Sequence, residues 1–434
     1  MRSPKTAAIM VALSLIVGVV TACSSSSSGD GKTLTYWASN QSTSLDADRK
    51  ILQPELDKFE KQTGIHVNLE VIPWSDLLNR ILAATTSGQG PDVLNIGNTW
   101  SASLQATGAF QKFDAATLAK VGGKDKFLAS SMTATGAPGQ DPAAVPLYGL
   151  AYALFYNKKM FSDAHLNPPT TWQELLDDAK RLTDPAKSQW GIAVQGASYT
   201  EGAHFAFMFG RQHGAQLFNG TQPQFDSPEM VAGIKQYTDL ITSGVANPSD
   251  AQAQNQTNTT GQFAAGKAAM IMMQNNAAAT LKTQNMDESQ YGVVPIPTID
   301  PLPAGGKPVS SHVAGIDITA FAGSQNSEGA LKFINFMTSL DEQKVLNAQL
   351  GSLPVVKDAY NDPQFSTPAI STYRKVLADR AESMPMIPQE SQFETLIGNA
   401  VKDLLAQAAV GQKPDDNAIK AKLTTANQQM RSGG

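Results

Sequence analysis

The histidines, the single cysteine and the glycine-rich stretches are the residues of this chain that could support catalysis or hold a metal ion. No two histidines have the His-Glu-x-x-His spacing that places two imidazoles on one helix face. No Cys-x-x-Cys and no Gly-x-Ser-x-Gly motif occurs. We therefore predict no catalytic residue, no metal site and no cofactor. The histidines are His66, His165, His204, His213 and His312.

Residues 261–268 nearly match a phosphate-binding loop. Gly261, Gly266 and Lys267 have the required spacing, but Ala268 stands where a serine or threonine hydroxyl would hold Mg²⁺. The segment before this stretch is rich in Gln, Asn and Thr and does not read as a β-strand. The match therefore does not indicate a nucleotide site.

Amides, hydroxyls and aromatic rings gather in loops after the predicted strands. Amides both donate to and accept from sugar hydroxyls, and an aromatic face covers the apolar side of a pyranose ring. This set suits a neutral polyol better than acid and base chemistry, although paired carboxylates could still hydrolyse a sugar. The residues are Ser39, Asn40, Gln41, Asn98, Thr99, Trp100, Tyr148, Tyr152, Gln274, Asn275 and Asn276.

Hydrophobic periodicity predicts the elements that position these loops. Residues 65–71 alternate strictly, which places His66 on a solvated strand face. Trp74 opens a helical stripe with Leu77, Leu78 and Ile81, so we interpret it as a core residue. Strands at 34–38, 65–71 and 92–96 alternate with helices, and this order predicts a mainly parallel sheet.

Further helix starts and stops follow in the second half of the chain. Thr171 and Glu174 form a capping-box pattern, and Ser227 with Pro228 opens another helix. A long apolar stripe over 393–405 precedes Gly411. Turn-rich breaks lie at 136–142, 247–260 and 298–308, and the first and third flank β-rich runs at 145–156 and 309–320.

The first 23 residues predict secretion. Arg2 and Lys5 precede an apolar run over 7–20, which is shorter than the roughly 20 residues of a membrane-spanning helix. Val20, Thr21, Ala22 and Cys23 resemble a bacterial lipobox, whose cysteine is lipidated. Because Cys23 is the only cysteine, no disulfide framework explains it. Residues 24–32 read as a flexible tether.

Size and charge narrow the class of protein. A chain of 434 residues exceeds the size of one hydrophobic core, so two lobes are expected. The formal net charge of −5 gives no basic face for a polyanion, which argues against nucleic acid.

Seven segments in order, behind a lipobox, resemble the extracellular solute-binding proteins of carbohydrate ABC importers, the maltose-binding-protein-like family. The resemblance covers nearly the whole chain after the signal segment. It implies a partner permease, a membrane reached through the lipid anchor, a carbohydrate ligand and a monomer outside the cell. The segments are 34–40, 59–67, 87–93, 145–149, 153–161, 263–270 and 327–336.

The resemblance also implies the fold. We expect an α/β, two-lobed periplasmic-binding-protein-like architecture, with a mainly parallel sheet flanked by helices in each lobe and a hinge crossed about three times. The expected boundaries are a signal peptide at 1–22, the lipidated cysteine and tether at 23–32, lobe 1 at 33–146 and 310–355, and lobe 2 at 147–309 and 356–434.

Ten residues are predicted to bind the ligand. Trp100 follows a strand end and is assigned to ring stacking or loop packing, and His204 to the cleft or to the core. His312 is expected on the cleft floor, while Tyr148 and Glu390 lie near the hinge and could instead pack between lobes. Asn275 and Asn276 could cap a helix. The full set is Asn40, Gln41, Asn98, Trp100, Tyr148, His204, Asn275, Asn276, His312 and Glu390.

Two positions depart from the family pattern. Asn276 and Glu394 stand where sugar-specific members often carry tryptophan, so maltose itself is not expected. The rival functions are binding of a glycerol-phosphate compound, a polyamine or a peptide, and, from another class, a lipoprotein glycosidase. Lysine and arginine are scarce near the predicted cleft loops, which disfavours a phosphate ligand.

Overall fold

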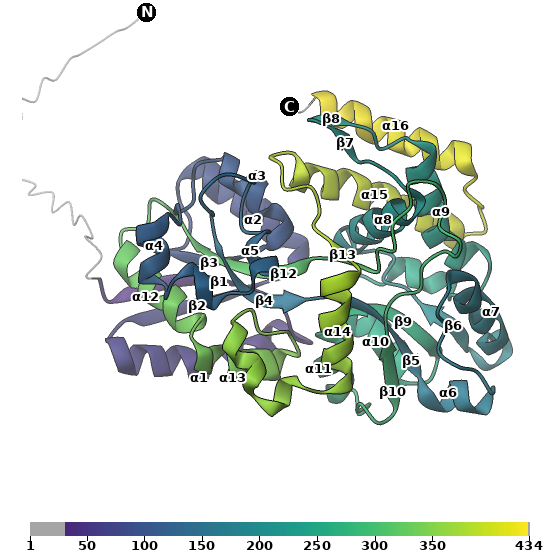
Figure 1. Ribbon diagram of the computed structural model, residues 1–434, viewed down its shortest axis with the longest axis horizontal. Coiled ribbons are helices and arrows are strands. Elements are labelled where there is room, and N and C mark those ends of the chain that lie inside the picture. Colours follow the sequence, from purple (N-terminus) through teal and green to yellow (C-terminus); the bar gives the residue numbers. More distant parts are fainter. Residues whose placement is uncertain (1–30, 433–434) are drawn as a thin grey trace, which may run out of the picture.

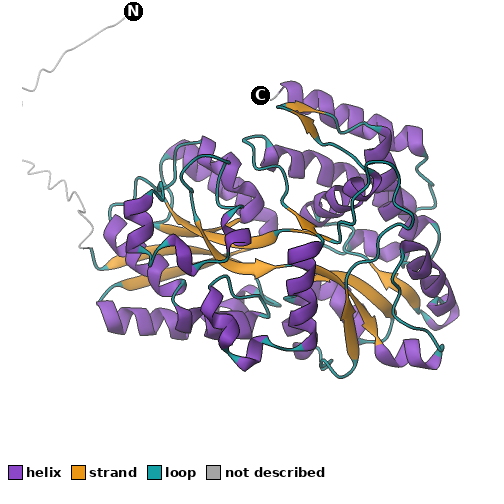
Figure 2. Cartoon of the chain, in the orientation of Figure 1, coloured by secondary structure: helices purple, strands orange, loops and turns teal. Residues whose placement is uncertain are grey.

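The computed structural model describes residues 31–432, and its two lobes lie side by side (Figure 1). Each lobe has a central sheet with helices on both faces (Figure 2). The predicted two-lobed α/β fold is therefore confirmed. Cys23 and the signal segment lie outside the described residues. Within 31–432, no helix is both long and apolar enough to cross a membrane.

Lobe 1 is built on a five-stranded sheet in the order β2-β1-β3-β12-β4. The sheet buries Tyr36 and Phe333, whose rings meet edge to face with centroids 5.0 Å apart. The strands are β1 (Thr33–Ser39), β2 (His66–Ile72), β3 (Val93–Gly97), β4 (Val145–Leu150) and β12 (Ala314–Ala320). The helices are α1 (Leu45–Thr63), α2 (Trp74–Ser87), α3 (Ser101–Ala106), α4 (Ala115–Lys120), α5 (Ala129–Met132), α12 (Ser327–Met337) and α13 (Leu340–Leu350).

Lobe 2 has a four-stranded sheet in the order β10-β5-β9-β6. The strands are β5 (Tyr152–Asn157), β6 (Trp190–Ala193), β9 (Ala268–Gln274) and β10 (Tyr291–Val294). The helices are α6 (Lys158–Asp163), α7 (Trp172–Leu182), α8 (Tyr199–His213), α9 (Pro228–Thr242), α10 (Gln256–Ala264), α11 (Ala277–Thr283), α14 (Pro368–Asp379), α15 (Glu390–Ala409) and α16 (Asp416–Ser432). Two-residue strands form the pairs β7 (Phe218–Asn219) with β8 (Gln222–Pro223) and β11 (Ser311–His312) with β13 (Ala381–Glu382).

The sheets are mixed, which corrects the expectation of mainly parallel strands. In lobe 1, β1 runs parallel to β2 and β3, but β12 is antiparallel to β3 and β4. In lobe 2, only β6 and β9 are parallel. The antiparallel strands β4, β5 and β12 adjoin the crossings between lobes. They enter their sheets without the covering helix that a parallel crossover requires.

The chain passes between the sheets at single residues. Ala151 separates β4 from β5, and Val313 separates β11 from β12, so the sheets change a few residues after the expected boundaries at 146 and 309. A third passage follows residue 356, because Val355 still accepts from the Leu128 amide of lobe 1 whereas α14 packs on the lobe 2 sheet.

Local signals explain several helix ends, and two predicted helix starts are confirmed. Thr171 and Glu174 form the capping box of α7, and Ser227 caps α9. Gly64 ends α1 with φ at 71°, a conformation that favours glycine. His66 is exposed beside Glu60, as the strand alternation predicted.

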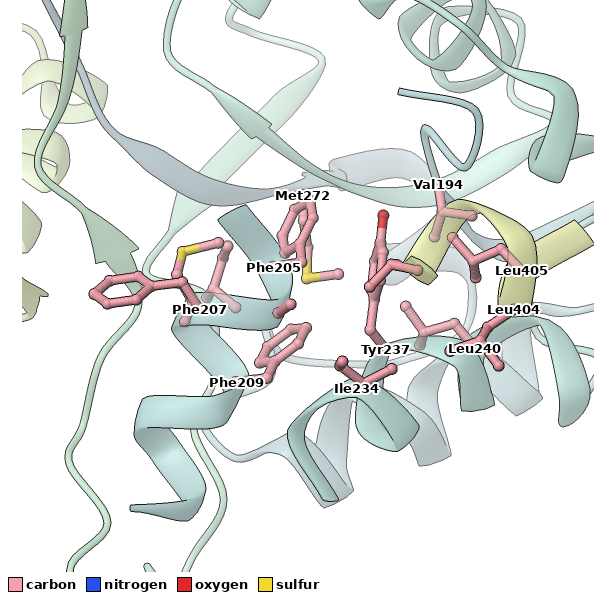
Figure 3. Packing of buried hydrophobic residues seen from close by; sticks show 14 of the residues in the cluster. Val194, Phe205, Phe207, Phe209, Ile234, Tyr237, Leu240, Met272, Leu404 and Leu405 are labelled. Carbon is pink, nitrogen blue, oxygen red and sulfur yellow. The ribbon is translucent and has the colours of Figure 1, made fainter. Parts of the chain in front are cut away.

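The core of lobe 2 holds α8, which carries Glu201 and His204, against α15, which carries Glu394. Phe205 stacks on Tyr237 with centroids 4.7 Å apart, and Leu404 and Leu405 fill the same cluster (Figure 3). The two helices approach closely at glycines. A Cβ added to Gly398 would lie 1.9 Å from the Tyr199 carbonyl oxygen, so only glycine permits this approach.

Candidate functional site

A cavity of about 640 Å³ lies between the lobes and is lined by residues of both. This volume is typical of a small-molecule site. Lobe 1 supplies residues 40–43, 73–75, 97–100 and 314–316, most of them just after β1 and β3. Lobe 2 supplies segments between 195 and 204, 254–257, Met273, Gln274, Asn276, His312, Glu394 and Lys402. Loops at the carboxyl ends of strands thus form much of the wall, as in other α/β folds.

Seven of the ten predicted residues line this cavity, although their contact with a ligand stays a prediction. Each of the seven is buried or half-buried. They are Asn40, Gln41, Asn98, Trp100, His204, Asn276 and His312.

The other three lie outside the wall. Tyr148 is buried in the core of lobe 1. Asn275 is occupied at the hinge, where its Oδ1 accepts from the Ala151 amide at 2.7 Å and its Nδ2 donates to the Gly351 carbonyl at 2.8 Å. Glu390 is fully buried one helical turn before Glu394. None of the three is among the lining residues, so the cavity gives their predicted ligand contacts no support and agrees with the packing roles left open for Tyr148 and Glu390.

A chain of hydrogen bonds connects four of the lining residues with the buried Tyr152. The Tyr152 hydroxyl lies 2.8 Å from both Glu201 Oε1 and His204 Nδ1. His204 Nε2 lies 3.3 Å from Glu394 Oε1, and the Trp100 indole donates to Glu394 Oε2 at 2.6 Å. Because Trp100 belongs to lobe 1 and Glu394 to lobe 2, this last bond joins the lobes.

The pKa shifts of this network show which groups carry charge. Burial opposes ionisation of Glu394, but hydrogen bonds from His204, Thr99 and Trp100 outweigh burial and lower its pKa. Burial alone would lower the pKa of His204, whereas its bond to Glu394 and the negative charge there raise it. A protonated His204 then donates to Glu394 and to the Tyr152 oxygen, and the Tyr152 hydroxyl donates to Glu201.

Burial shifts the pKa values of the other ionisable groups nearby in the direction of their neutral forms. Burial, and then the charge of His204, holds the pKa of His312 well below its usual range. Burial raises the pKa of Glu201. Burial, and then the neighbouring Glu394, raises the pKa of Glu390 well above its usual range. His204 and Glu394 are therefore the pair whose charged forms their mutual contact stabilises.

The two tryptophans of the cavity wall differ in burial and in hydrogen bonding. Trp100 is only 1% exposed, its N–H is bonded to Glu394, and its ring packs edge to face on Trp74 at 5.5 Å. Trp74, which the helical stripe assigned to the core, lines the cavity and donates to the Asn40 carbonyl at 2.7 Å. Trp100 thus agrees with the packing alternative left open for it, and Trp74, which also packs against the core, is the less buried of the two rings.

Several lining residues were not predicted. Glu201 lies three positions before His204 on α8, and this spacing could have indicated that the two share a helix face. Glu394 had been noted only as a departure from the family pattern. No short-range signal brings the others to the cavity. The unpredicted lining residues include Trp74, Gln195, Tyr199, Glu201, Gln254, Gln256, Gln274, Glu394 and Lys402.

The part of the chain that the structure describes holds no group of three or more His, Cys, Asp and Glu placed to bind a metal ion. What the arrangement can do is enclose a small polar solute between amides, hydroxyls, two tryptophans and a paired imidazole and carboxylate.

Comparisons with known proteins agree with this geometry. Residues 42–344 match the model of a family described as bacterial extracellular solute-binding protein. The chain is 26% identical over 343 residues to a maltotriose-binding protein of Pyrococcus abyssi, covering 76% of this chain and 69% of that one. It is 25% identical over 416 residues to a diacetylchitobiose binding protein of Streptomyces coelicolor, covering 92% of each.

Two further similar proteins are named with ligands other than an oligosaccharide. An sn-glycerol-3-phosphate-binding periplasmic protein of Rhizobium meliloti is 24% identical over 307 residues, which cover 68% of each chain. Among solved structures, an ABC transporter solute-binding protein of Agrobacterium radiobacter in complex with ribitol is 25% identical with a TM-score of 0.78. That match covers 93% of this chain and 99% of that one.

Proposed function

The chain belongs to the bacterial extracellular solute-binding proteins, and we propose that it captures a sugar or oligosaccharide between its lobes and delivers it to the permease of an ABC importer. The observation that carries the proposal is the composition of the cleft wall. Asn40, Gln41, Asn98 and Asn276 supply amides, and Trp74 supplies an aromatic ring. Amides match sugar hydroxyls in both directions, and the ring matches an apolar sugar face.

The names of the relatives support a sugar as the solute. The maltotriose-binding and diacetylchitobiose-binding proteins are similar to this chain over most of its length. A phosphate compound is favoured less, because Lys402 is the only lysine or arginine among the described lining residues. Polyamines and peptides are the remaining solute classes to compare.

Hydrolysis of the solute is not part of the proposal. Glu201 and Glu394 are the carboxylates among the described lining residues, and both oxygens of Glu394 are engaged within the protein, Oε1 by His204 and Oε2 by Trp100. A glycosidase would instead need one free acid and one free nucleophile or base. We infer that the protein binds its ligand without chemical change.

Anchoring at Cys23 belongs to the same proposal and places the protein at the outer face of the cell membrane. A lipidated cysteine with two or three acyl chains would hold it there stably. Cys23→Ala should release the protein from the membrane fraction, and unchanged fractionation of this variant would contradict the anchor.

The test is a panel of oligosaccharides, polyamines, peptides and sugar phosphates. Binding of each is measured as a shift in the melting temperature of the protein prepared without its signal segment. Ligand at about 100 times its dissociation constant should stabilise the protein by roughly 2.7 kcal/mol. The expected result is a reversible shift with at least one neutral sugar and no cleavage on prolonged incubation. A shift with charged solutes alone, or cleavage of the sugar, would overturn the proposal.

A further inference from the structure

Four lining residues of lobe 2 contain buried polar atoms that have no hydrogen-bond partner. Glu201 Oε2, Gln195 Oε1 and Asn276 Oδ1 are three of these atoms, and the two ring nitrogens of His312 are the others. Among the described lining residues of lobe 1, no buried side-chain nitrogen or oxygen is left in this way. Buried polar atoms are normally bonded, so unpartnered ones in a cavity wall indicate where a ligand would bond.

The neighbours of these atoms determine that they are acceptors. Gln195 Nε2 donates to the Gln254 carbonyl at 3.3 Å, and Asn276 Nδ2 lies 3.5 Å from the Gln41 carbonyl. A carbonyl can only accept, so each amide must turn its nitrogen toward it and leave its oxygen unpartnered. Glu201 Oε1 already accepts from Tyr152, which leaves Oε2 for a ligand.

The hydrogen-bonding balance of this wall is therefore one-sided. The two amide oxygens and the Oε2 of an ionised Glu201 accept only, and a neutral His312 adds one donor and one further acceptor. A sugar hydroxyl donates one proton and also accepts, and an ammonium donates three. A carboxylate has no proton to donate at neutral pH and a phosphate monoester is then largely the dianion, and either would bring negative charge toward Glu201.

We propose that lobe 2 selects the solute by its hydrogen-bond donors, takes a hydroxyl-bearing or amino-bearing sugar and rejects its acidic counterparts, with Glu201 as the specificity-determining residue. This inference rests on the proposed function, because it specifies the chemical class of the sugar.

Glu201→Gln tests this role with little change of shape. The Tyr152 hydroxyl still needs an acceptor, so the new Oε1 should take that place and turn an NH₂ group to the position of Oε2. One acceptor of the wall then becomes a donor. Glu229→Gln is the matched control, since Glu229 is an exposed glutamate of the same lobe outside the cavity.

Each set of probes compares a hexose with its 2-amino, uronate and 6-phosphate derivatives. Three such sets are used, one each in the gluco, galacto and manno series. Glycerol 3-phosphate is added, and binding is measured by calorimetry at neutral pH. In the series that binds, we expect the uronate and the phosphate to bind at least about 30-fold more weakly than the hexose, and the amino sugar to bind at least as tightly. Glu201→Gln should shrink the preference for hexose over uronate about tenfold, and Glu229→Gln should leave it unchanged.

Each other outcome has a distinct meaning. A uronate that binds wild type as tightly as the hexose overturns the donor selection and leaves sugar binding intact. An unchanged preference in folded Glu201→Gln, verified by its melting curve, overturns the role of Glu201. Binding of glycerol 3-phosphate with no binding of any hexose overturns both this inference and the proposed function.

Discussion

The two walls of the cleft differ in how their polar groups are used. On the lobe 1 wall the side-chain donors are already bonded within the protein: Asn40 to Asp48 and the Ser42 carbonyl, Gln41 to Ser39, and Asn98 to the Val313 carbonyl. On the lobe 2 wall, Glu201, Gln195, Asn276 and His312 keep unpartnered polar atoms.

This difference suggests a division of labour. Lobe 1 offers a preorganised surface, with Trp74 positioned by its bond to the Asn40 carbonyl. Lobe 2 offers hydrogen-bonding capacity that only a ligand or water can satisfy. Leaving a buried acceptor without a partner costs about 1–3 kcal/mol, so a ligand that supplies the missing donors gains that amount. Recognition of the polar groups of the ligand should therefore depend more on lobe 2, and recognition of its shape should depend more on lobe 1.

The largest effect is expected where α8 and α15 cross, because this crossing builds the lobe 2 wall. Gly398→Ala would place a Cβ 1.9 Å from the Tyr199 carbonyl oxygen and force the helices apart. We expect a loss of about 3 kcal/mol in the free energy of unfolding, measured by denaturant titration. Asn399→Ala, on the exposed side of the same helix, is the control and should cost under about 1 kcal/mol.

The bond between the lobes should have the next largest effect. Glu394→Ala removes the acceptor of Trp100 and the ion-pair partner of His204, and losing one partner of a buried pair costs about 3 kcal/mol. Affinity for the sugar identified by the panel should fall about 100-fold in calorimetry. Asp403→Ala, an exposed residue of α15, should leave affinity unchanged, and equal affinities in both variants would contradict the interlobe role.

Trp100→Phe tests the hydrogen bond between Trp100 and Glu394 by itself, because it keeps an aromatic ring and removes the indole donor. If the Trp100 to Glu394 bond acts as a unit, the double variant with Glu394→Ala should be no weaker than Glu394→Ala alone. Additive losses would show that the two side chains act independently.

A smaller effect is expected from the support of the lobe 1 loop. Asp48 accepts from the Gln41 and Ser42 amides and from Asn40 Nδ2, which fixes the loop after β1. Asp48→Asn turns one acceptor into a donor among these N–H groups, so the loop should loosen and sugar affinity should fall about tenfold. A variant that binds as wild type would mean that lobe 1 preorganisation is unimportant.

The smallest effect concerns pH. The pKa of His204 is raised, so the stabilisation that its protonated ring gives through Glu394 is fully present below its ordinary pKa of 6.5. That stabilisation is lost as pH rises through the raised pKa. Glu394 has a lowered pKa, so its contribution is present above 4.5 and lost as pH falls through the lowered value.

Sugar affinity should therefore fall about threefold on the alkaline side, and His204→Gln, which still donates to Glu394 but does not titrate, should shrink that decline. A decline that His204→Gln leaves as steep as in wild type would assign it to another group.

The sequence could predict what depends on short-range patterns. Caps, glycine stops and strand alternation located α7, α9 and β2, because these signals act within a few residues. The loops after β1 and β3 were predicted as site residues for the same reason: strand ends in α/β folds deliver loops to a common edge.

What could not be predicted depends on contacts between distant segments. Glu394 meets Trp100 and His204 only because α15 returns to α8 through the glycine crossing, and nothing near Glu394 in the sequence indicates this. Trp74 has core spacing on its helix, yet it opens the helix and so reaches the cavity edge. Strand direction was mistaken for β5 and β12 because the chain enters those strands from the other lobe.

A crystal structure with the sugar that gives the greatest thermal shift would test the central claim most directly. The account predicts the sugar in the interlobe cavity, a ring face against Trp74, and hydroxyls that donate to Glu201 Oε2 and Asn276 Oδ1. It further predicts that lobe 2 makes most of the direct hydrogen bonds to the ligand. A sugar bonded chiefly to Asn40, Gln41 and Asn98, with the lobe 2 oxygens still unpartnered, would contradict the account.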